Sequence, residues 1–172
     1  EHGPPFAVAK YASDGALVFT KVAASGSTWA SPNVAVTGAG EVLLSASYQG
    51  TIDLGGGPRG SAADKRQFVT KFGATGEELW THDIAADPVG GPPLIAIEPG
   101  GSFFLTGRGS PGMAILGEPV PETALFAAAF DAGGKPVDVQ TFPVTRLVYG
   151  WLSASAAGAL VLVGGFEGAL DL

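Results

Sequence analysis

The sequence repeats itself, and an internal repeat constrains the fold of a chain more strongly than its composition does. The segments KYASDGALVF (Lys10–Phe19), KFGATGEELW (Lys71–Trp80) and AFDAGGKPVD (Ala129–Asp138) align without gaps. Each has an aromatic residue, a short polar segment and a glycine at the same position. The matched turn glycines are Gly15, Gly76 and Gly134. These segments predict one structural unit that has been copied three times.

A second set of matches follows the first in each copy. An apolar-alternating stretch, a glycine-bearing turn and another apolar stretch recur in Val34–Ser47, Ile95–Arg108 and Leu152–Gly165. The phrase YQGTIDL (Tyr48–Leu54) then matches FEGALDL (Phe166–Leu172), and the middle copy degenerates to GSPGMAIL (Gly109–Leu116). The matches divide the chain into three units of one continuous repeat domain. The units are residues 1–66, 67–124 and 125–172.

Each unit is predicted to hold two β-hairpins and a short extra strand. In the second unit, apolar alternation predicts strands over 68–72, 78–84, 94–98, 102–108 and 113–116. Asp-Gly, Thr-Gly and Gly-Gly dipeptides supply residues that tolerate positive φ, as tight hairpin turns require. The expected fold class is all-β, with three tandem four-stranded antiparallel units that follow one another as propeller blades do.

Three phrases carry a resemblance to a known kind of repeat. FVTKFGATGEELWTHDI, LIAIEPGGSFFLTGR and GTIDLGGG together resemble the bacterial β-propeller repeats of large exported or surface-anchored proteins. The resemblance covers nearly the whole chain and rests on turns and core positions. It implies a partial propeller or open arc and an extracellular or cell-surface location, with an export signal that is not present in this chain. It implies no particular activity.

Three units raise the question of closure, because propeller rings usually have 4 to 8 blades. The chain is expected to be a segment of a longer propeller, a protomer whose self-association completes a ring, or an open arc docked on other protein. At about 25 cal/mol per Å², a bare blade face of several hundred Å² forfeits on the order of 10 kcal/mol. Association is therefore expected. Unit three departs from the pattern, with Ala129 and Asp138 in place of the lysine and the tryptophan.

Charge and composition argue against several classes of function. A net charge of -7 has the wrong sign for binding nucleic acid or an anionic membrane surface. The chain contains no cysteine, which excludes disulfides, thiolate metal sites and a cysteine nucleophile. Residues 147–166 are uncharged and long enough for a membrane helix. Their glycines and the repeat alignment predict two strands around a turn instead.

No catalytic arrangement is recognisable in the sequence. His2 lies near the start and His82 in an apolar-alternating run, and no serine belongs to a Gly-x-Ser-x-Gly motif. Glu77 and Glu78 are adjacent, so in a strand they point to opposite faces and do not form an acid–base pair. The chain is expected not to be an enzyme and to need no cofactor. The alternative is an enzyme whose active site forms only in a completed propeller.

Few residues are candidates for binding. Trp29 lies in the polar, turn-like segment SGSTWASP and is the candidate ligand-binding residue. Asp53 and Asp171 occupy matched positions, where they are expected to accept backbone N–H bonds, with calcium binding as the alternative. The matched aromatic residues are predicted to pack in the core rather than to stack on sugar rings. They are Tyr11, Phe19, Phe72, Trp80 and Phe130.

These observations together predict a non-enzymatic binding or scaffold module of an exported bacterial protein. Its loops are expected to recognise a protein or glycan partner, and further propeller blades or a second copy are expected to complete the ring. The alternative is a structural subunit of a larger assembly. Nucleic acid, a membrane span and a metal centre are not expected.

Overall fold

The structure is a computed structural model that describes residues 7–22, 27–28, 32–61, 65–86, 91–115, 117–122, 124–143, 146–154 and 160–167. Within these ranges the chain forms antiparallel β-strands and no helix, which confirms the all-β prediction. The strands predicted for the second unit are present in the predicted order. No helix in the described residues is long and apolar enough to cross a membrane.

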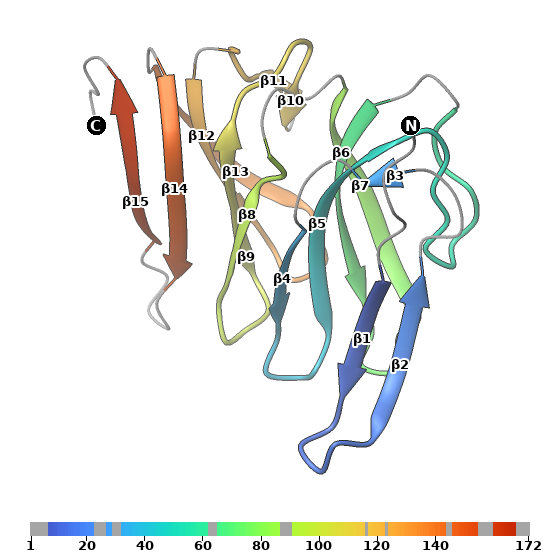
Figure 1. The fold of residues 1–172 in the computed structure, drawn as a ribbon. Helices are drawn as coiled ribbons and strands as arrows, with labels where there is room; N and C mark the ends of the chain where they lie inside the picture. Colours follow the sequence, from blue (N-terminus) through green and yellow to red (C-terminus); the bar gives the residue numbers. More distant parts are fainter. Residues whose placement is uncertain are drawn as a thin grey trace.

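Two sheets and two separate hairpins make up most of the structure (Figure 1). The first sheet has the order β3-β5-β6-β7, and β4 also pairs with β5. Its strands are β3 (Ser27–Thr28), β4 (Asn33–Val36), β5 (Val42–Gln49), β6 (Lys65–Phe72) and β7 (Glu78–Ala86). The second sheet has the order β13-β12-β9-β8. Its strands are β8 (Leu94–Ile97), β9 (Phe103–Arg108), β12 (Ala124–Phe130) and β13 (Pro136–Pro143).

The remaining strands form two-stranded hairpins. The N-terminal hairpin pairs β1 (Ala7–Tyr11) with β2 (Leu17–Val22), and the C-terminal hairpin pairs β14 (Arg146–Ala154) with β15 (Leu160–Glu167). A short hairpin of β10 (Ala114–Ile115) and β11 (Glu118–Pro119) lies in the connection between β9 and β12. The uncharged stretch 147–166 therefore lies in β14, β15 and the connection between them.

The sheets do not coincide with the sequence units. The sequence units predicted that the two hairpins of one unit share a sheet. In the structure, the second hairpin of one unit pairs instead with the first hairpin of the next unit. Thus β5 pairs with β6, with Val42 opposite Phe72, and β9 pairs with β12, with Phe103 opposite Phe130. The physical reason is burial: almost every residue of β5 and β6 is buried, so these two strands occupy the middle of a sheet.

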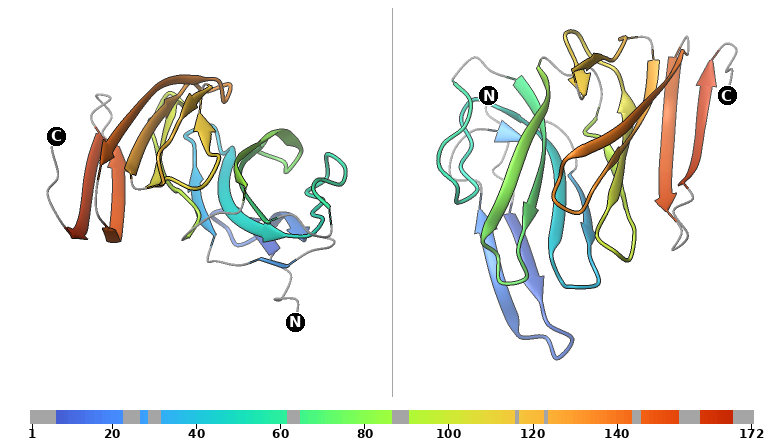
Figure 2. Two further views of the ribbon diagram at one scale, coloured as in Figure 1. Left: turned by 90° about the horizontal axis from the view of Figure 1, so that it is seen from above. Right: turned by 180° about the vertical axis from the view of Figure 1, so that it is seen from behind.

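The sheets and hairpins follow one another in chain order across the molecule (Figures 1 and 2). The N-terminal hairpin lies at one side, followed by the first sheet, the second sheet and the C-terminal hairpin at the other side. Strand β8 lies beside both β4 and β14. The equivalent strands β4, β8 and β14 of the first sheet, the second sheet and the C-terminal hairpin are therefore successive neighbours.

An apolar layer fills each of two contacts between successive elements. Phe19 and Val8 of the N-terminal hairpin pack on the first sheet, where Phe68 and Phe72 are buried. Leu43 and Val69 of the first sheet belong to the second layer. This layer also holds Trp80, Ile95, Ile97, Phe103, Phe126 and Phe130. Burying one such large side chain stabilises the fold by about 1.5–3 kcal/mol.

The hairpin turns of different units have the same backbone conformation. Gly15, Gly76 and Gly134 have φ values of 86°, 97° and 83°. In the first turn, the Gly15 N–H donates to the Ala12 carbonyl and the Ala12 N–H donates to the Ala16 carbonyl. The same two hydrogen bonds form at the matched positions of the other two turns. Glycine is favoured here because a Cβ is costly at positive φ.

The repeat also extends into the long connections at the other end of the sheets. After β5, Ile52 and Arg59 exchange backbone hydrogen bonds of 2.9 and 2.8 Å, and Ile52 and Leu54 are buried. At the matched positions after β9, the Val120 N–H donates to the Met113 carbonyl at 2.9 Å, and Met113 and Ile115 are buried. Both connections are thus anchored on the core by equivalent residues.

One of the predicted core aromatics is not in the core. Phe19, Phe72 and Phe130 are buried and Trp80 is partly buried, but Tyr11 is 62% exposed. The prediction was wrong for Tyr11 because its matched residues, Phe72 and Phe130, lie in strands that have a neighbour on both sides. Among the described residues, β1 pairs with β2 alone.

Candidate functional site

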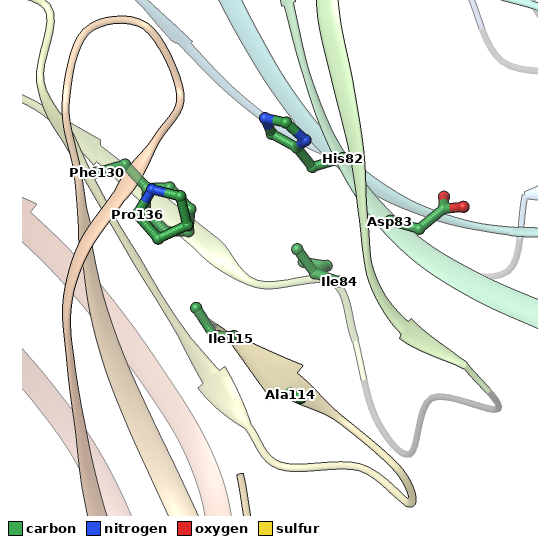
Figure 3. Close-up of a pocket in the computed structure, with 7 residues that line it drawn as sticks. All are labelled: His82, Asp83, Ile84, Ala114, Ile115, Phe130 and Pro136. Carbon is green, nitrogen blue, oxygen red and sulfur yellow. The ribbon is translucent and has the colours of Figure 1, made fainter. Parts of the chain in front are cut away.

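A small open pocket lies where the first sheet, the β10-β11 hairpin and the second sheet meet (Figure 3). Its volume is about 170 Å³. The lining residues are His82, Asp83, Ile84, Ala114, Ile115, Phe130 and Pro136. Pockets that enclose a drug-sized ligand have volumes of about 300–1,000 Å³. This pocket is therefore suited to a single side chain or small group and not to an enclosed substrate.

His82 is the exposed end of an aromatic stack that runs into the core. Its ring stacks on Trp80 at a centroid distance of 4.9 Å and an interplanar angle of 25°. Trp80 stacks on Phe103 at 5.8 Å, and Phe103 stacks on Phe130 at 4.8 Å. Trp80 and His82 are two residues apart in β7 and so share a face. That spacing was visible in the sequence, but its partners in the second sheet were not.

Asp83 does not act together with His82. Adjacent strand residues point to opposite faces, and Figure 3 shows the Asp83 side chain on the side of β7 away from His82 and Ile84. Its carboxylate instead lies 3.5 Å from the Arg66 guanidinium. The pocket therefore brings together an imidazole and apolar side chains, an arrangement that suits stacking and packing.

The carboxylates of Glu77 and Glu78 are engaged separately. Glu78 accepts hydrogen bonds from Arg59 at 3.1 Å and from the Thr81 hydroxyl at 2.8 Å, and its side chain is almost completely buried. Glu77 is exposed and accepts a 2.6 Å hydrogen bond from the Thr75 hydroxyl, which lowers the pKa of Glu77 below its ordinary value. The Glu78 contacts tie the connection after β5 to strand β7.

Asp53 organises the connection that follows β5. Its Oδ1 accepts hydrogen bonds from the Gly55 N–H at 2.7 Å and the Gly57 N–H at 3.2 Å. Within the described part of the chain, no three histidine, aspartate or glutamate side chains are grouped as a metal site would require. The matched Asp171 and the candidate ligand-binding residue Trp29 both lie outside the described residues.

Two lysines bind backbone carbonyls of the neighbouring sheet. Lys10 of β1 donates to the Gly40 carbonyl at 2.6 Å and to the Ala74 carbonyl at 2.8 Å, both in turns of the first sheet. The matched Lys71 of β6 donates at 2.9 Å to the Ala132 carbonyl, in a turn of the second sheet. Lys71 also forms a 2.7 Å ion pair with Glu41. In unit three this position is Ala129, so the same contact is not made.

Two exposed valines lie on β4, in the first sheet, and two on β15, in the C-terminal hairpin. Val34 and Val36 of β4 are 61% and 54% exposed, and Val161 and Val163 of β15 are 55% and 56% exposed. We call these four residues the exposed valine set. In each strand the two valines are two residues apart and share a face.

The comparisons with known proteins give no family for this chain. No family model and no curated protein matches its sequence.

Proposed function

We propose that the chain is a non-enzymatic binding or scaffold module of the β-propeller type. The observation that carries this proposal is the neighbouring position of β4, β8 and β14. By the repeat alignment the three strands are equivalent, and a propeller has such equivalent strands around its centre. The matched turns and the matched contacts of Lys10 and Lys71 support repeated blades.

The surface proposed to bind a partner is the end of the molecule that carries the long connections. Residues 50–61 and the β10-β11 hairpin lie at one end of the sheets, and the short hairpin turns lie at the opposite end (Figure 1). The buried Ile52, Leu54, Met113 and Ile115 fix these connections on the core. Loops held by a rigid scaffold are frequent binding elements. We propose a protein or glycan as the partner.

The location is proposed from the same repeats. Because the repeats resemble those of exported or surface-anchored bacterial proteins, we propose that the chain belongs to such a protein and acts outside the cell or at its surface. The absence of cysteine from the sequence is compatible with either redox environment.

Binding is favoured over catalysis by the state of the ionisable groups. Glu78, Asp83 and Glu41 are each engaged by a cation, Arg59, Arg66 and Lys71 respectively. His82 stacks on Trp80 and faces apolar residues in its pocket. A general base is expected within hydrogen-bond reach of a nucleophile or a bound water. These contacts support a module that holds a partner without transforming it.

A glycan array and a panel of hydrolase and lyase substrates test the proposal on the same purified chain. We expect binding on the array and no turnover in the panel. Glu118→Lys, an exposed change in β11 at the proposed binding end, is expected to weaken binding at least tenfold. Asp138→Lys, the same charge reversal at an exposed site on β13, is expected to leave binding unchanged. Turnover, or equal effects of the two changes, would contradict the proposal.

A further inference from the structure

The two hairpins at the ends of the series match different halves of a four-stranded sheet. Apart from the two-residue β3, the first sheet pairs its strands in the order β4-β5-β6-β7, and the second sheet has the order β8-β9-β12-β13. By the repeat alignment, the C-terminal hairpin β14-β15 matches β4-β5 and β8-β9, whereas the N-terminal hairpin β1-β2 matches β6-β7 and β12-β13. Among the described residues, β15 pairs with β14 alone and β1 with β2 alone. Each hairpin therefore presents the sheet edge that the other would occupy.

The repeat also fixes the register of the missing pair. Val42 lies opposite Phe72 in the first sheet, and Phe103 lies opposite Phe130 in the second. The matched residues in the hairpins are Leu160 of β15 and Tyr11 of β1. An antiparallel pair in this register places Val161 opposite Lys10 and Val163 opposite Val8. Tyr11 would then have a strand on each side, as its buried counterparts Phe72 and Phe130 do.

The exposed valine set fits the same arrangement. Val161 and Val163 match Leu43 and Ser45, which are fully buried in the first sheet. Val34 and Val36 match Ile95 and Ile97, which pack with Leu43 in the apolar layer between the two sheets. By this equivalence, Val161 of β15 faces Val34 and Val36 of a β4 strand in the following sheet. Within one chain β15 lies at the C-terminal end of the series and β4 lies in the first sheet, with the second sheet between them (Figure 1).

We propose that two copies of this chain join head to tail, with β15 of one copy pairing with β1 of the other in the register Leu160 opposite Tyr11. This inference rests on the propeller arrangement proposed above. Each composite sheet would have the order β14-β15-β1-β2. Two copies then contain four complete sheets and two composite sheets, six in all, a number within the usual 4 to 8 blades of a closed propeller. A head-to-tail contact that closes in this way forms a finite ring.

Light scattering coupled to size exclusion tests the proposal on the whole chain. We expect a mass of twice 17.2 kDa, and we expect Val34→Asp or Val161→Asp to give monomers. Val137→Asp, on β13 at a position 65% exposed, is the matched control and is expected to remain a dimer. An equimolar mixture of V34D and V161D retains one intact valine contact, so the mixture is expected to recover heterodimer. If the dimer instead buried the same surface of both copies, no recovery of heterodimer would be expected from this mixture.

Disulfide trapping tests the register, because the chain has no cysteine of its own. Under mild oxidation, V8C mixed with V163C is expected to form a covalent heterodimer in high yield. V8C mixed with V161C is expected to form at least tenfold less, since residues diagonal across a strand pair are about 7–8 Å apart, and Cα atoms more than about 7 Å apart do not bridge. Equal yields from the two mixtures would overturn the register.

The outcomes separate this inference from the proposed function. A monomeric wild-type chain with β-sheet circular dichroism overturns the dimer, while the same sample remains usable for the glycan array and the substrate panel. Conversely, a dimer that turns over a substrate contradicts the non-enzymatic function and leaves the β15-β1 contact supported. A dimer that survives both V34D and V161D overturns the contact proposed here.

Discussion

Gly134 lies against the indole ring of Trp80, and a Cβ added at Gly134 would come within 2.5 Å of the indole Cε2. The matched Gly76 lies in the same way against Phe19, where an added Cβ would come within 2.6 Å of the ring. In both cases the turn of one sheet packs on an aromatic residue of the preceding element. This contact explains why glycine recurs in these turns beyond its tolerance of positive φ.

Alanine substitutions separate the two reasons for glycine. Gly15 has the same φ region, but a Cβ there meets nothing within 4 Å. Gly15→Ala is therefore expected to cost about 1–2 kcal/mol, from the left-handed backbone alone. Gly134→Ala and Gly76→Ala are expected to cost about 1–3 kcal/mol more, from the clash with the ring. Urea unfolding measures the three free energies, and equal costs would contradict the packing role.

Lys71 is expected to hold the first and second sheets together. Its side chain is 5% exposed, and its ammonium group binds both the Ala132 carbonyl and the Glu41 carboxylate. Lys71→Met keeps the length of the side chain and removes these contacts, so we expect a loss of about 1–3 kcal/mol in the free energy of unfolding. Lys135→Met, at an exposed turn position, is the control and is expected to change stability by less than about 0.5 kcal/mol. A small effect at both sites would exclude the lysine contact as a stabilising element.

The pKa of Glu77 is expected to depend on Thr75. The Thr75 hydroxyl stabilises the charged carboxylate and so lowers the pKa of Glu77. Because the pKa of Glu77 is lower in the folded chain than in the unfolded chain, ionisation of Glu77 stabilises the fold at pH values above the unfolded pKa. This stabilisation is lost as the pH falls through the folded pKa. Thr75→Ala is expected to raise the pKa of Glu77 toward its ordinary value, as measured by NMR titration of its carboxyl carbon. An unchanged pKa would contradict the role of the hydroxyl.

Asp53 is expected to act as a loop anchor. Asp53→Ala removes the acceptor of two backbone N–H groups and is expected to destabilise the chain by about 1.5–3 kcal/mol, whereas Asp53→Asn keeps an acceptor oxygen and is expected to cost less. Thermal unfolding of wild type with and without millimolar calcium is the companion measurement. We expect calcium to leave Tm unchanged. A calcium-dependent rise in Tm that D53N abolishes would favour calcium binding at Asp53 instead.

The repeat and its turns could be predicted from the sequence because they depend on local residues. Gly15, Gly76 and Gly134 can be aligned by eye, and their turns share one hydrogen-bond pattern. Which two hairpins share a sheet could not be predicted in this way. The repeat length is the same wherever the boundary between units is drawn, so the sequence does not show which hairpins share a sheet. The pairing of β5 with β6 depends on contacts between residues of different units.

The candidate site was predicted less well for the same reason. The stack from His82 to Phe130 joins strands of two sheets, and no spacing in the sequence brings them together. One longer-range signal was present. Tyr48 packs on Gly60 in the first connection, and the matched pair after β9 is Gly109 against Pro121, with the large and small residues exchanged. Such an exchange between copies points to a contact.

The most direct test of the central claim, that each sheet joins hairpins of consecutive repeats, is the pattern of cross-strand NOEs in an NMR spectrum of the whole chain. We predict backbone NOEs between β5 and β6, with Leu43 opposite Lys71, and between β9 and β12, with Leu105 opposite Ala128. NOEs that instead connect the β6-β7 hairpin to β8, with none to β5, would contradict it.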